Sequence, residues 1–331
     1  MTTKKERIYN AVNGLKTDRQ PYAMWTHLPG IDLDPVKLAE TTYQFYKEYD
    51  IDLIKTMNNG MYAVEDFGCV VDYSEVAKGG VSKVVSTPVN TIDDWKKIKP
   101  VSIEDSVALK RELYSLKLLL EMVRDEEVPV LFTVFSPFTT ANKLCGGKVL
   151  EHIATGKTED IHKALQAITE TTIELVREAN RLGASGVYFA TQMSNYSVCS
   201  EEVFREFGAY YDRQILEASE GFADAVHCHG SDIMYDILKE YPVDIFNWHA
   251  GESLPTIEEA KKMNKCLMGG IIRGDITESN HARIREQIQH CWDVMGGVHH
   301  ILSPGCVIRY PLNTVTLKYI REAIDEVTSK K

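Results

Sequence analysis

The chain alternates short apolar segments with longer stretches of helical periodicity. Eight segments have the length and apolar content of buried strands, at 22–27, 51–56, 129–134, 186–190, 225–230, 243–247, 266–270 and 299–303. Between most of them, apolar residues recur at helical spacing, as at 36–48 and 159–182. This alternation predicts a parallel sheet covered by helices, and eight strands favour a closed (β/α)8 TIM barrel over an open sheet.

Residues 67–90 interrupt the alternation. Two β-prone runs, 69–73 and 81–85, flank Gly79-Gly80 and predict a small β-hairpin excursion. We find no linker rich in proline, glycine or serine, no low-complexity tract and no short repeat. We therefore expect residues 1–331 to form a single domain that carries the hairpin as decoration.

Charge and cysteine usage exclude several classes of function. The formal net charge is −11, which argues against nucleic acid and against an anionic membrane as partners, since both bind proteins through basic patches. The first residues are polar rather than an apolar signal core, and no run of about 18 apolar residues could span a membrane. The seven cysteines are widely spaced. These features are typical of a cytoplasmic protein with reduced thiols.

The segment 225–230 contains a His-x-His pair. Successive side chains of a strand point to opposite faces, so His227 and His229 share one face and Cys228 points the other way. Cys306 follows Pro-Gly after the last predicted strand and can face the same end of the barrel. Two imidazoles, one thiolate and an open fourth position suit a catalytic zinc. The alternative is that both histidines are ordinary polar residues near a strand end.

Other polar residues also follow predicted strands. In a (β/α)8 barrel the active site lies at the C-terminal ends of the strands, so residues placed there are candidates for substrate contact. The candidates for substrate binding are His27, Asn58, Asn59, Gln192 and His249. His299 and His300 begin their strand, and we expect them at the opposite end.

The donor set alone leaves the reaction open. Zinc lowers the pKa of a bound thiol, which suits methyl transfer to sulfur, and it lowers the pKa of bound water, which suits hydrolysis. A hydrolase would need a general base near the metal, and Glu252 and Asp275 are placed to serve.

Several motifs along the chain resemble those of the uroporphyrinogen decarboxylase-like superfamily, and within it the zinc-dependent corrinoid methyltransferases. The motifs are Lys5-Glu6-Arg7, 18–22, Ser136-Pro137-Phe138-Thr139, 226–230, Gly269-Gly270-Ile271 and 303–306. That branch is similar in carrying a His-x-Cys pair and a distant cysteine as zinc ligands. The resemblance implies that His227, His229 and Cys306 are both the metal ligands and the catalytic residues, with His229 in place of the first cysteine.

The resemblance also implies an activity and its partners. A methyl group would move between a corrinoid held by a partner protein and a small substrate, either a thiol acceptor or an O- or N-methyl donor in the demethylase direction. Zn²⁺ would be the resident cofactor. The decarboxylases of the superfamily carry arginines after the first strand and an aspartate after the second, whereas residues 25–30 contain no arginine and Asn58 or Asn59 stands at the second place. The alternative that stays open is a metal-free lyase or a ligand-binding barrel.

Overall fold

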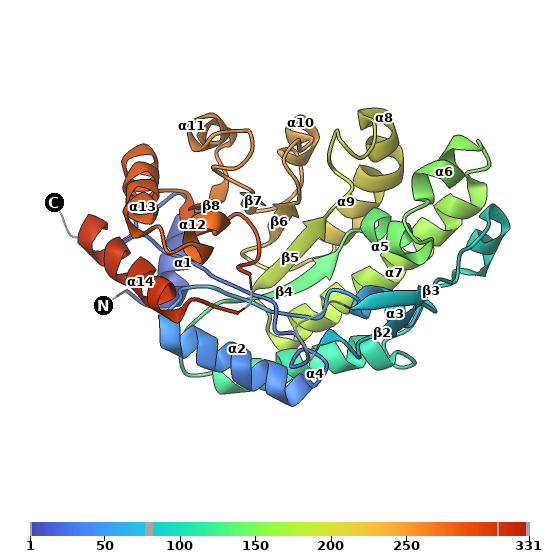
Figure 1. Ribbon diagram of the computed structural model, residues 1–331, viewed down its shortest axis with the longest axis horizontal. Helices are drawn as coiled ribbons and strands as arrows, with labels where there is room; N and C mark the ends of the chain where they lie inside the picture. The colour runs from blue at the N-terminus through green and yellow to red at the C-terminus, as the bar shows by residue number, and fades with distance from the viewer. Residues whose placement is uncertain (1, 77–81, 310, 329–331) are drawn as a thin grey trace.

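Seven parallel strands form one curled sheet at the centre of the computed structural model, which describes residues 2–76, 82–309 and 311–328 (Figure 1). The strands are β1 (Ile54–Lys55), β4 (Val130–Phe135), β5 (Gly186–Thr191), β6 (Ala225–Cys228), β7 (Ile245–Trp248), β8 (Cys266–Ile271) and β9 (His300–Pro304). Each pairs in parallel with the next one along the chain. The C-terminal ends of these strands form the mouth of the sheet.

Helices surround the outer face of the sheet (Figure 1). The α-helices of the described residues are α1 (Lys4–Val12), α2 (Pro35–Tyr49), α3 (Tyr62–Glu65), α4 (Val107–Met122), α5 (Pro137–Leu144), α6 (Val149–Ala154), α7 (Glu159–Leu182), α8 (Glu201–Phe204), α9 (Tyr210–Leu216), α10 (Tyr235–Leu238), α11 (Ile257–Ala260), α12 (Arg273–Thr277), α13 (His281–Met295) and α14 (Thr314–Thr328). The helix predicted at 159–182 is α7, which buries a stripe that includes Ile161, Leu165 and Ile168. No helix among the described residues is long and apolar enough to cross a membrane.

The segment predicted as the first strand does not join the ladder of the sheet. Residues 22–27 make isolated bridges, Tyr22 with Leu302 and Thr26 with Ile308. The Tyr22 carbonyl accepts a hydrogen bond from Asp52 N (2.9 Å), so the segment lies between β9 and the start of β1. Pro21 has no N–H to extend this pairing. The α/β architecture with a curled parallel sheet is confirmed, while the ladder formed by the described residues has seven strands and does not close.

The predicted hairpin is present. β2 (Val70–Asp72) and β3 (Lys83–Ser86) pair antiparallel, and most of their side chains are exposed. The expected turn at Gly79-Gly80 lies outside the described residues. The hairpin is therefore an addition to the sheet and not part of its core.

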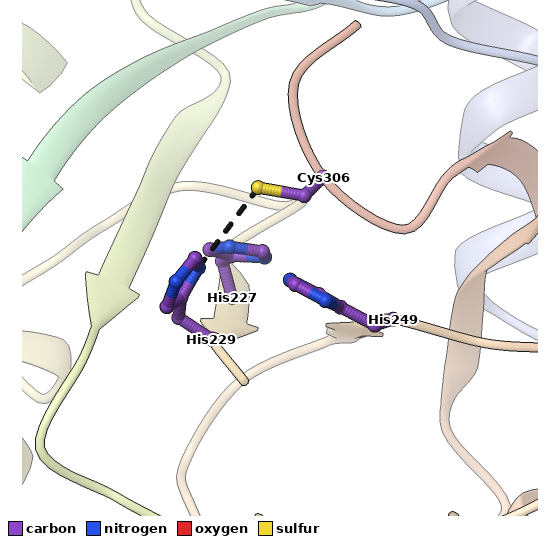
Figure 2. A group of neighbouring side chains, drawn as sticks. All are labelled: His227, His229, His249 and Cys306. Atoms are coloured by element: carbon purple, nitrogen blue, oxygen red, sulfur yellow. Dashed lines mark hydrogen bonds between the residues drawn. The ribbon is translucent and has the colours of Figure 1, made fainter. Parts of the chain in front are cut away.

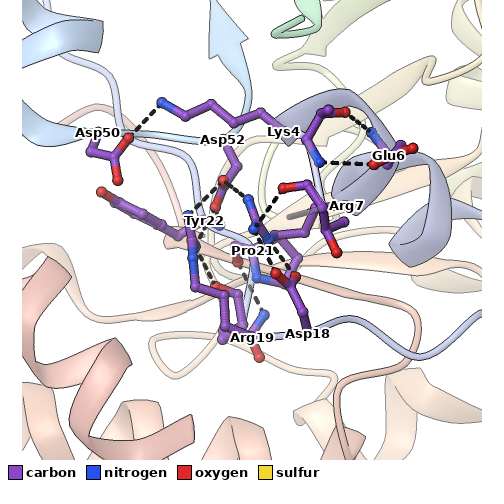
Figure 3. A network of polar contacts seen from close by, with 12 residues as sticks. Lys4, Glu6, Arg7, Asp18, Arg19, Pro21, Tyr22, Asp50 and Asp52 are labelled. Carbon is purple, nitrogen blue, oxygen red and sulfur yellow. Dashed lines mark hydrogen bonds and ion pairs between the residues drawn. The ribbon is translucent and has the colours of Figure 1, made fainter. Parts of the chain in front are cut away.

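A buried ion-pair network fixes the N-terminal end of the sheet (Figure 3). Asp52, which is fully buried just before β1, accepts hydrogen bonds from Arg7 Nη1 (2.7 Å), Arg19 Nη1 (2.7 Å) and the backbone N–H of Tyr22 (3.1 Å). Arg7 also pairs with Asp18 (2.7 Å). This network ties α1 and the 18–22 motif to β1, at the opposite end of the sheet from the mouth. Its role is structural.

Candidate metal centre

Four potential metal ligands converge at the mouth: His227, His229, His249 and Cys306 (Figure 2). Each offers one donor atom, and these atoms all lie within 4.8 Å of one another. A tetrahedral zinc with bonds of about 2.0–2.3 Å would separate its ligands by roughly 3.5 Å. Shifts of about one ångström would therefore bring the four donors to bonding positions.

The register of β6 and β7 explains why the histidines meet. His227 of β6 lies beside Asn247 of β7 in the parallel ladder. Because side chains on one face recur every two residues, His229 and His249 follow on the same face, one from each chain segment. The centroids of these two rings are 5.1 Å apart and their planes are nearly perpendicular. The sequence thus places a His-x-His pair and an Asn-x-His pair side by side.

Gly305 brings the thiol to the histidines. A Cβ atom at this position would lie 2.5 Å from His249 Cα and 2.9 Å from the Trp248 carbonyl oxygen, so only glycine allows such a close approach. The segment after β9 therefore packs directly against the end of β7. Cys306 Sγ comes to lie 3.9 Å from His229 Nδ1.

Asn247 determines which nitrogen of His227 is available. Asn247 Nδ2 donates to the carbonyl oxygen of Met268 (2.8 Å), which can only accept, so Asn247 Oδ1 must be the acceptor for its other partners. Oδ1 receives hydrogen bonds from Tyr188 Oη (2.7 Å) and from His227 Nδ1 (2.5 Å). His227 therefore carries its proton on Nδ1 and keeps the Nε2 lone pair free. Such an outer partner is what orients a metal-binding histidine.

The protonation states also suit a metal ion. Burial lowers the pKa of all three imidazoles, and Arg273 adds to this shift at His229 and His249, with the pKa of His249 at about 4. Neutral imidazoles are the form that binds metal. Burial raises the pKa of the Cys306 thiol, so the thiolate would form only as a bound metal displaces the proton. Among the described residues, His249 Nε2 is buried and has no hydrogen-bond partner. Buried polar atoms seldom stay unpaired, and a metal would complete this one, so the donor set fits zinc.

The other candidates for substrate binding lie outside the cluster, while His249, predicted among them, lies inside it. His27 and Gln192 are exposed. Asn58 donates to Glu112 of α4 (2.8 Å), and Asn59 Oδ1 accepts from the backbone N–H of Met61 (2.8 Å). Both amides are thus engaged in local structure.

The two possible general bases are also paired with other side chains. Glu252 pairs with Arg273 (3.2 Å), and Asp275 accepts hydrogen bonds from Gln287 (2.6 Å) and Asn280 (2.8 Å). Sequence reasoning missed Asn247. Its signal was the Asn-x-His spacing, which repeats the His-x-His spacing one strand later.

Comparisons with known proteins support the fold. The profile of the family described as uroporphyrinogen decarboxylase (URO-D) matches residues 3–327. A methyltransferase from Methanosarcina mazei has a similar structure, with a TM-score of 0.82, 18% identity, and coverage of 98% of this chain and 99% of that chain. A B12-independent methionine synthase from Shewanella sp. W3-18-1, in complex with selenomethionine, has a TM-score of 0.62 at 14% identity and covers 94% and 97%. No curated protein matches significantly.

Proposed function

Since the chain belongs to the uroporphyrinogen decarboxylase family, we propose that it is a zinc-dependent methyltransferase that moves a methyl group between a corrinoid protein and a small substrate. The convergence of three imidazoles and one thiol at the mouth carries this proposal. The fold shared with the Methanosarcina mazei methyltransferase over nearly the whole length of both chains supports it. We further propose that the curled sheet is a (β/α)8 barrel in which residues 22–27 stand in place of the eighth strand.

We assign His227, His229 and Cys306 as the ligands, with His249 as the fourth donor. When bound there, zinc would lower the pKa of an acceptor thiol or polarise the heteroatom of an O- or N-methyl donor. The protein supplies three neutral imidazoles and one thiolate, which leave part of the positive charge of the metal uncompensated. Asn247 holds His227 in one tautomer and orientation. His249 is the donor that the family pattern does not require, so a substrate heteroatom would take its place.

Metal content is the test of this proposal. We expect one zinc per chain in the wild-type protein and none in Cys306→Ala. Cys291→Ala is the matched control, because Cys291 is a buried cysteine of α13 outside the cluster, and it should keep its zinc. Absence of zinc from the wild type, even after zinc is added back, would leave the metal-free lyase or binding barrel as the better reading.

Activity then decides the direction of transfer. Loss of the methyl group from methylcobalamin in the presence of a thiol would identify a thiol acceptor. Methylation of cob(I)alamin by a methoxy or methylamine compound would identify the demethylase direction. Whichever activity the wild type shows should disappear in Cys306→Ala and persist in Cys291→Ala.

A further inference from the structure

Two lysines near the mouth have no carboxylate partner among the described residues. Lys55 is the last residue of β1, and Lys143 lies in the last turn of α5. Within the part of the chain that the structure describes, each ammonium donates only to a backbone carbonyl, Lys55 to Thr56 (3.1 Å) and Lys143 to Gly60 (2.9 Å). A half-buried cation that lacks a counter-ion is costly, and an anion that binds beside it recovers part of that cost.

Lys55 is close to the metal-ligand cluster. Its ammonium lies 5.0 Å from the centroid of the Tyr188 ring, and that ring stacks on His227 with centroids 5.4 Å apart. A single aromatic ring therefore separates this cation from a proposed metal ligand. Burial lowers the pKa of Lys55 to about 8, so most of the ammonium remains charged at pH 7.

Lys143 contributes to the same positive region. Its ammonium lies 4.8 Å from the centroid of the Phe135 ring, at the end of β4. Partial desolvation lowers the pKa of His27 to about 4, and the charges of Lys55 and Lys143 contribute to this shift. Lys143 also donates to Gly60 in the segment that follows β1, and β1 pairs with β4, so both cations lie at the same part of the mouth. By contrast, Arg273 is neutralised by Glu252.

We propose that Lys55 and Lys143 form an anion subsite that holds the carboxylate or sulfonate of a small substrate while its reactive heteroatom faces the His/Cys cluster. This inference rests on the proposed function for the identity of the reactive end. The positive charge is local, since the whole chain carries a net charge of −11. Lysine is a point charge without the fixed fork of arginine, so it suits either anion.

Matched thiols test the subsite in the cobalt-substituted protein. The dissociation constants of 3-mercaptopropionate, 2-mercaptoethanesulfonate and neutral 3-mercapto-1-propanol are measured from the thiolate-to-cobalt absorption. An ion-assisted contact of this kind corresponds to about a tenfold or greater preference for an anionic thiol. The favoured anion shows whether the natural group is a carboxylate or a sulfonate. Equal affinity for charged and neutral thiols would overturn the proposal.

Variants test whether the two lysines cause the preference for anionic over neutral thiols. Lys55→Met and the double variant Lys55→Met/Lys143→Met should lose it while still binding the neutral thiol, and Lys55→Arg should retain it. Lys163→Met is the control, because Lys163 is exposed on α7 and pairs with Glu159 (2.7 Å). Methionine has a similar length and removes a buried charge, so these variants should fold. An unchanged preference in the double variant would overturn the proposal.

An experiment on the metal-free protein tests the anion subsite independently of the proposed zinc site. Binding of propionate and ethanesulfonate to Cys306→Ala is followed by saturation-transfer NMR. We expect binding in Cys306→Ala and its loss when Lys55→Met and Lys143→Met are added. Binding without any metal affinity in the wild type would refute the zinc site and keep the subsite. Absence of binding together with a normal zinc content would refute the anion subsite and leave the zinc site standing.

Discussion

Asn247 is the residue whose replacement most directly tests the architecture of the metal centre. Asn247→Leu keeps the approximate shape of the side chain and removes its hydrogen bonds to His227, Tyr188 and Met268. Two buried donors, His227 Nδ1 and Tyr188 Oη, then lose their acceptor, at about 1–3 kcal/mol each. A loss of several kcal/mol is a large part of the 5–15 kcal/mol that is typical for a folded domain.

The same change should weaken metal binding. His227 loses the partner that fixes its proton on Nδ1, and removal of such an outer partner typically lowers metal affinity by about 10–100-fold. The zinc dissociation constant is measured at pH 7 by competition with a chromophoric chelator. The urea midpoint of the metal-free protein gives the change in stability.

Two further variants make the result specific. Asn247→Asp keeps an oxygen for His227 and Tyr188 but loses the donor to Met268, so we expect near-normal zinc affinity in a less stable protein. Tyr188→Phe removes one hydrogen bond at a cost of about 1 kcal/mol and should leave zinc affinity almost unchanged. Wild-type zinc affinity in a folded Asn247→Leu protein would refute the orienting role of Asn247.

Two other predictions concern the thiol segment and the acid stability. Gly305→Ala places a Cβ 2.5 Å from His249 Cα, so we expect loss of zinc with an unchanged circular dichroism spectrum; retention of zinc would show that the segment can move away. Burial lowers the pKa of His300 to about 4, and an unfolded histidine titrates near 6.5, so the unfolded state binds more protons between these values. Stability should therefore fall as the pH falls from about 6.5 to 4, by about 3 kcal/mol for this group. His300→Leu should show a shallower decline in urea midpoint, and an identical decline would contradict the assignment.

Side-chain periodicity was sufficient to predict much of the site. The period of two along 225–230 placed His227 and His229 on one face, and the Pro-Gly turn after the last strand placed Cys306 at the same end. The position of His249 at the mouth was predicted, but its place in the cluster was not. That place depends on the register between β6 and β7, which a single sequence does not reveal.

Other features were hidden because burial and hydrogen bonding do not follow from residue type. Residues 22–26 of the predicted first strand are buried, yet they pair only through isolated bridges. Asn58 follows a strand, as a substrate contact would, but turns to Glu112 on a helix. Nothing in the sequence distinguished Lys55 from other strand residues, whereas its ammonium lies over a buried aromatic ring.

The cluster contains a single sulfur atom, and this affects how it would respond to oxidants. Sites built from several cysteines can form a disulfide when the metal leaves, which protects the sulfur atoms and is reversed by cellular thiols. Cys306 has no second thiol in the cluster, and Cys228, between the two histidines, lies on the opposite face of the strand. Oxidation of the metal-free form would therefore pass through a sulfenic acid toward irreversible states, unless an outside thiol captured it. A bound metal would therefore protect the Cys306 thiol from oxidation.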